Sequence, residues 1–382
     1  MTATGEATLR ERLGRMITVQ SSLIGVIGTL AIIAIVGAAF QAIEANRRAD
    51  AADRNQNVIS AETQVYNLLG SLAQERGYAL IAMASANNAY RDDMRSARRA
   101  VDREFEAVET AVAGLPAFAE RDAKVSAVRE AMTALTAMRE KVDGTFETDS
   151  ADSGGGDSDV NFSSGFGSAA PATPRIDKAV ETAIGAVDEL RSAFVYALLG
   201  DDREVRSYQS LTHQLWVMRE YAAREWSAVA EAIAGGEAIS QQNQLLNTLY
   251  AGRVGGAWDQ ARTLIASPMI DPALARYSDE IQSGFFEGFR WDVLDVTVSE
   301  SADVAAGEGS YSIALREFVS SAMAATDPIR DLSNEAGDKA LVLAESKQGA
   351  ASGSFLVQIV VLTVTMAVVA GAGFMVRSNI VR

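Results

Sequence analysis

The sequence predicts an all-α protein in which two transmembrane helices flank an extracytoplasmic ectodomain of two stacked four-helix-type bundles. Two uncharged stretches, residues 16–43 and 348–376, each contain an apolar run long enough to cross a membrane. A hydrocarbon core about 30 Å thick needs roughly 20 such residues. The segment between them has few prolines, abundant alanine and apolar residues at helical spacing. Amphipathic helices of this kind bury their apolar stripes against one another, which favours bundles.

The flanking charges predict which side of the membrane each end occupies. Arginines lie between each stretch and the nearer end of the chain: Arg10, Arg12, Arg15, Arg377 and Arg382. Because basic residues are retained in the cytoplasm, both termini are expected there, with the ectodomain in the periplasm of a bacterium and the chain in its inner membrane. A cleaved signal peptide is the alternative for the first stretch, but its apolar core of about 7–15 residues would be shorter.

These features divide the chain into five expected parts. They are a cytoplasmic segment at 1–16, a transmembrane helix at 17–43, a helical sensor ectodomain at 44–353, a second transmembrane helix at 354–376, and a cytoplasmic stub at 377–382. The stub is expected to lead into a HAMP and output region that the sequence does not contain.

The first half of the ectodomain predicts three helices and a loop. The helices are expected at 47–87, continuing out of the membrane, at 89–114, and at 118–143. The tripeptide Gly114-Leu115-Pro116 closes the second helix, and Gly144 ends the third. Residues 144–173 are rich in glycine, serine and aspartate, so they are expected to form a loop or linker.

The second half predicts four more helices, at 174–199, 203–234, 238–266 and 312–347. Pro174 suits a first helical turn, and Ser240 is expected to be an N-cap because its hydroxyl can accept a backbone hydrogen bond. The stretch 267–307 is less regular. The last helix leads into the second span and is expected to be kinked near Pro328, which has no backbone N–H to donate.

Composition excludes several classes of function. The formal net charge is −16, and the acidic excess lies between the two stretches, so nucleic acid is not an expected partner. The chain has no cysteine and a single histidine, His213. Metal sites built from cysteines or several histidines are therefore excluded, and no cofactor is expected. An enzyme is the least favoured class because no nucleophile–base pair or phosphate-binding loop is present.

Arginines within apolar helix faces are the most specific feature of the sequence. Arg76 lies midway between Leu72 and Leu80 on one such face, and Arg224 and Arg253 lie on two others, with Arg219 close to the face of Arg224. A buried arginine is costly unless it is paired. One interpretation pairs them with carboxylates of neighbouring helices, of which Glu75, Glu220, Glu225 and Glu231 are available. The other uses the planar guanidinium groups to bind a small oxyanion.

Three segments around these arginines resemble the nitrate- and nitrite-sensing (NIT) receptors of bacteria. They are LLGSLAQERGYALIAMAS, which carries Gln74, Glu75, Arg76 and Gly77, then REYAAREWSAVAEAIAGGEAIS, which carries Arg224 and Glu225, and LLNTLYAGRVGGAWDQARTLI, which carries Arg253. The resemblance covers roughly residues 60–350. Ala223 stands where the family prefers glycine, and Trp226 replaces the second arginine of its motif.

The resemblance implies two four-helix bundles that bind nitrate or nitrite near the arginines and that couple to chemotaxis, kinase or cyclic-dinucleotide outputs. The expected ligand-binding residues are Arg76, Arg224, Arg253 and Arg219, with Glu75, Gly77 and Glu225 as motif neighbours. We expect a homodimeric receptor in which helix displacement signals to a cytoplasmic domain or protein. The alternative is a structural or accessory two-span membrane protein whose ectodomain binds another protein.

Overall fold

Helices joined by short turns make up the parts of the chain that the structure describes. The computed structural model describes residues 3–85, 88–152, 175–307 and 309–380. Within these ranges no strand occurs, so the predicted all-α class is confirmed. The chain divides into two compact units, one made of Met1–Asp53 with Glu345–Arg382 and the other of Arg54–Ala344.

The two longest helices, α1 (Ala3–Ala84) and α9 (Leu315–Ile380), carry the two candidate membrane spans. Each contains a window long and apolar enough to cross a bilayer. In the unit formed by the ends of the chain, large apolar side chains such as Ile32 and Val360 are exposed, as lipid-facing residues would be. Small residues are buried there instead, at Ala38, Ala42 and Ala45, which supports close packing of this face.

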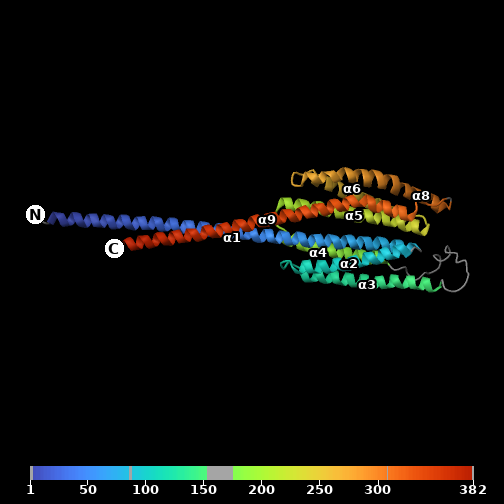
Figure 1. The fold of residues 1–382 in the computed structure, drawn as a ribbon, viewed down its shortest axis with the longest axis horizontal. Coiled ribbons are helices and arrows are strands. Elements are labelled where there is room, and N and C mark those ends of the chain that lie inside the picture. Colours follow the sequence, from blue (N-terminus) through green and yellow to red (C-terminus); the bar gives the residue numbers. More distant parts are fainter. Residues whose placement is uncertain (1–2, 86–87, 153–174, 308, 381–382) are drawn as a thin grey trace. The chain divides into compact units, whose positions relative to one another are not determined.

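In the unit Arg54–Ala344, the second half of α1 lies beside three helices that form the first bundle (Figure 1). They are α2 (Asn88–Ala113), α3 (Arg121–Asp152) and α4 (Ile176–Leu198). Their buried side chains recur at helical spacing, as in Val180, Ala183 and Val187 of α4. The amphipathic pattern of the sequence therefore becomes a shared core.

The second bundle contains α5 and α6 with α8 and the first half of α9 (Figure 1). The bounds are α5 (Arg203–Gly235), α6 (Gln241–Ile265), η2 (Pro272–Ala275), α7 (Arg276–Ile281), η3 (Gln282–Leu294) and α8 (Asp295–Ala306). Ser240 is the N-cap of α6, as predicted, because its hydroxyl accepts a hydrogen bond from the N–H of Asn243. Gly236 ends α5 in the left-handed region at φ 64°, which glycine adopts without strain.

Two segments differ from the prediction. Helix α3 continues through Gly144 to Asp152, because one glycine within a helix costs only about 1 kcal/mol. The rest of the expected loop and Pro174 lie outside the described residues. The stretch expected to be irregular is helical and includes a π-helix, η3, which buries Phe285 and Phe289. Helix α9 continues through Pro328, and the kink expected there stays a prediction.

Candidate functional site

Arg76 lies inside the Arg54–Ala344 unit, where it makes a bidentate ion pair with Glu220 of α5. Its Nη1 and Nη2 atoms donate to the two carboxylate oxygens at 2.7 and 3.0 Å. The two side chains are only 4% and 3% exposed. The apolar face of α1 therefore predicts the burial of Arg76 correctly. Its guanidinium group is neutralised by Glu220, one of the four carboxylates that the sequence offered as ion-pair partners.

Arg224 shares the same carboxylate. Its Nε donates to Glu220 at 2.6 Å and its Nη1 to Glu181 of α4 at 2.6 Å. Burial alone would raise the pKa of Glu220, but the charges of Arg76 and Arg224 hold that pKa below its ordinary value. Glu220 is thus ionised, and it accepts two hydrogen bonds from Arg76 and one from Arg224.

Arg253 is exposed on α6, in contrast to the apolar face on which the sequence placed it. Its guanidinium carbon lies 5.7 Å from the ring centroid of Tyr221, on the same ring that Arg224 approaches at 5.6 Å. The difference arises because α6 carries apolar residues on more than one side. Leu245 and Leu249, which also belong to the helix, are exposed as well.

Arg219 lines a cavity of about 70 Å³ between α1, α5 and α9. No ion pair or hydrogen bond joins its guanidinium group to another residue that the structure describes. Burial and the nearby charge of Arg330 lower the pKa of Arg219 to about 10. The guanidinium group still carries its charge at pH 7, and no carboxylate in the described ranges forms an ion pair with it.

Glycine at position 70 of α1 makes room for this side chain. A Cβ atom built on Gly70 would lie 3.4 Å from Nη2 of Arg219. Trp216 and Trp226 provide apolar walls, while Gln74 and Thr326 add polar groups. The cavity exceeds the roughly 10–15 Å³ that one water molecule requires, and it suits a ligand of a few atoms.

Helix α9 supplies a second cation to the cavity, Arg330, which the sequence analysis did not single out. Arg330 is held by Asp327 at 2.7 Å and by Asp331 at 3.3 Å. Arg330 and Asp327 line the cavity beside Met323 and Thr326. The signal that could have found them is the set of polar residues around Pro328, namely Thr326, Asp327 and Arg330, in a helix that is otherwise apolar toward the core.

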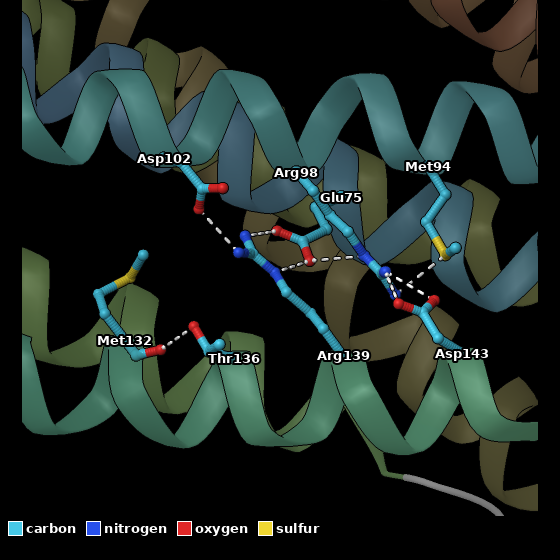
Figure 2. A network of polar contacts seen from close by, with 8 residues as sticks. All are labelled: Glu75, Met94, Arg98, Asp102, Met132, Thr136, Arg139 and Asp143. Atoms are coloured by element: carbon cyan, nitrogen blue, oxygen red, sulfur yellow. Dashed lines mark hydrogen bonds and ion pairs between the residues drawn. The ribbon is translucent and has the colours of Figure 1, made fainter.

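Glu75 is fully buried on the other side of α1, between α2 and α3 (Figure 2). Arg139 donates to its two oxygens at 2.7 and 2.6 Å, and Nε of Arg98 lies 3.6 Å away. Asp102 and Asp143 complete the network through Arg139 and Arg98 respectively. The adjacent residues Glu75 and Arg76 therefore fasten α1 to different bundles.

The other motif neighbours have structural surroundings of their own. Gly77 is buried, and a Cβ atom there would lie 3.4 Å from the ring of Trp226. Glu225 accepts a hydrogen bond from Arg290 at 3.1 Å, and its second oxygen has no partner among the described residues. Burial raises the pKa of Glu225 to about 7 although Arg290 opposes the rise. Its charge therefore changes near neutral pH.

No cluster of metal-ligating side chains occurs in the described parts of the chain. The single histidine, His213, is partly buried: burial lowers its pKa, and its ring stacks on Trp216 with 6.1 Å between the centroids. The ring therefore belongs to the packed face of α5.

A family model for nitrate and nitrite sensing matches residues 67–284, more than half of the chain. The chain belongs to the NIT family. Membership assigns it to the nitrate- and nitrite-sensing domains of signalling proteins. The NIT match contains all four arginines that the sequence analysis selected and ends before α9, which supplies Arg330.

The fold of this NIT protein is similar to that of the NasR transcription antiterminator. The TM-score is 0.54 at 16% sequence identity, over 87% of this chain and 82% of the other. At that identity the likeness concerns the fold alone. Curated protein sequences give no match to the chain.

Proposed function

We propose that the chain is the sensory and membrane-spanning part of a receptor, not an enzyme, and that it binds nitrate or nitrite at Arg219. One observation carries this proposal: in the cavity between α1, α5 and α9, the guanidinium group of Arg219 is partly buried and forms no ion pair with another described residue. An oxyanion would supply that charge and accept two parallel hydrogen bonds from the fork.

Arg76 and Arg224 act in this proposal by holding Glu220. The carboxylate lines the same cavity as Arg219. Because Arg76 and Arg224 engage both of its oxygens, Glu220 is kept from pairing with Arg219. The two arginines therefore position the site and set its charge, while Arg219 makes the direct contact. Arg253 contributes from outside by packing on Tyr221.

The shape of the cavity favours a small planar ligand. Trp216 and Trp226 lie on one helix with Arg219 and Ala223 between them in sequence, and all four line the cavity. Flat apolar walls and a planar fork accommodate a trigonal oxyanion better than a tetrahedral one of greater height. Nitrate and nitrite are therefore expected to bind more tightly than sulfate.

Transmission follows from which helices line the cavity. Helices α1 and α9 both line it, and the same two helices carry the candidate membrane spans. A ligand shifts a conformational equilibrium only through different affinities for the two states. An anion that contacts Arg219 on α5 and the groups of α9 favours the arrangement in which these helices approach. We propose that this displacement reaches a cytoplasmic output in a homodimer of the inner membrane, with a periplasmic ectodomain.

Calorimetric titration of the full chain in detergent micelles tests the proposal. Nitrate and nitrite are expected to give saturable heat, sulfate is not, and Arg219→Gln is expected to abolish binding. Arg262→Gln removes the same charge from an exposed position of α6 that does not line the cavity, and should bind as the parent does. Absence of heat with both anions, or unchanged binding by Arg219→Gln, would sink the site.

One observation favours a second candidate, an accessory membrane protein whose ectodomain binds another protein. Arg76 and Arg224 are both satisfied by internal carboxylates, as structural ion pairs are. A parent chain that gives no heat with either anion would support this candidate.

A further inference from the structure

A second cavity, of about 400 Å³, lies beside the first, between the end of α1, the start of α2 and α9. It is lined by Tyr78, Tyr90, Asp93, Arg316 and Ser320, among others. Met323 and Asp327 line both cavities. The two spaces therefore adjoin along one stretch of α9.

This second cavity, called the outer cavity from here on, contains hydrogen-bond donors that have no partner in the part of the protein that the structure describes. The hydroxyl of Tyr90 is buried and has no hydrogen-bond partner among the described residues. Arg316 is exposed at the rim of this cavity and no ion pair joins it to another described residue; its charge acts on Tyr90 against the rise in pKa that burial causes. A buried unpartnered donor beside an unpaired cation is the arrangement that an anion satisfies.

Met323 forms the partition between the cavities. Its Sδ accepts a hydrogen bond from the hydroxyl of Tyr78 at 3.4 Å, which fixes the thioether against α1. Asp327, one turn later, is drawn aside by Arg330 at 2.7 Å. Methionine has three rotatable side-chain bonds, so this partition can swing aside without movement of the backbone.

We propose that the outer cavity is the entrance of the anion site, with an oxyanion subsite on Arg316 and Tyr90, and that Met323 is the gate between the two. The entrance presupposes the inner site at Arg219 proposed above. The arriving anion binds first at Arg316, where the carboxylate of Asp93 keeps its affinity low. It then passes Met323 and reaches Arg219.

Stopped-flow tryptophan fluorescence with nitrate tests the gate in the full chain, because Trp216 and Trp226 line the first cavity, at Arg219. Met323→Ala opens the partition and is expected to raise the association and dissociation rates together, by roughly tenfold, with the dissociation constant within about twofold. Met323→Phe fills it and should slow both rates. Opposite shifts in the two variants keep the test informative if one of them folds poorly.

Arg316→Gln tests the outer subsite. Electrostatic guidance raises association rates by about tenfold or more, so the variant should lose roughly that factor in association rate and most of its salt dependence. Because the anion leaves by the same route, the dissociation rate should fall with the association rate, and Arg262→Gln should match the parent in both. Normal equilibrium binding with unchanged rates in all variants would overturn the entrance alone. Absence of any nitrate signal in the parent would overturn the inner site together with it.

Discussion

Replacing Arg219 by methionine distinguishes a ligand-binding guanidinium group from a structural one. The pKa of Arg219 is lowered from 12.5 to about 10, which corresponds to about 3 kcal/mol of destabilisation of its charged form. Screening by solvent at this partly buried position reduces the penalty to about 1–2 kcal/mol. In anion-free buffer, Arg219→Met is therefore expected to raise the free energy of unfolding by about 1–2 kcal/mol.

Arg76→Met is the matched control, because it removes the same group from a helix that faces the same cavity. Its bidentate pair with Glu220 is almost fully buried, and breaking such a pair costs about 3–5 kcal/mol. The two substitutions should therefore change stability in opposite directions. The assay is urea unfolding of the full chain in nonionic micelles, followed by tryptophan fluorescence and far-ultraviolet circular dichroism.

Ligand linkage provides the second half of the test. At a nitrate concentration 100 times the dissociation constant, the parent should gain about 2.7 kcal/mol, and Arg219→Met should gain nothing. If Arg219→Met lowered the free energy of unfolding as much as Arg76→Met does, Arg219 would have a structural role and the reasoning would be refuted.

Three further predictions concern pH, the first bundle and the cavity wall. Because the pKa of Glu225 is raised from 4.5 to about 7, its stabilising contribution is present below about pH 4.5 and is lost as pH rises through 7. The free energy of unfolding should fall by up to about 3 kcal/mol between about pH 4.5 and 7, and Glu225→Gln should flatten this profile in urea titrations. Glu75→Gln should cost about 3–5 kcal/mol, since Arg139 loses its buried partner, and a thermal melt that matched the parent would contradict this. Gly70→Val should weaken nitrate binding roughly tenfold in calorimetry, because its side chain meets Arg219, while stability changes little.

The helical order could be predicted from sequence because local signals mark it. Ser240 and Gly236 act within one turn of their own helices, so their roles can be recognised without knowledge of the fold. The π-helix η3 could not be predicted from local signals; its buried Phe289 contacts Phe318 of α9, which is distant in sequence.

The candidate site was predictable only in part for the same reason. The periodicity of α1 buries Arg76 correctly, but its partner Glu220 lies 144 residues away, and no local pattern identifies it. Arg219, at the edge of its apolar face, lines the cavity because Gly70 of another helix leaves space for it. Helix periodicity tells which residues turn inward, whereas the presence of a counter-ion is a property of the assembled fold.

The ion pairs of the adjacent residues Glu75 and Arg76 limit the kind of movement that α1 can make. Consecutive residues on a helix point about 100° apart, and Glu75 and Arg76 are each locked to a different bundle. A twist of α1 about its own axis would pull one anchor away from its partner as soon as it relaxed the other. A shift of an ångström or two along the axis would leave both pairs within reach through small side-chain adjustments. The ion pairs of Glu75 and Arg76 therefore oppose rotation of α1 about its axis and permit a small translation along that axis.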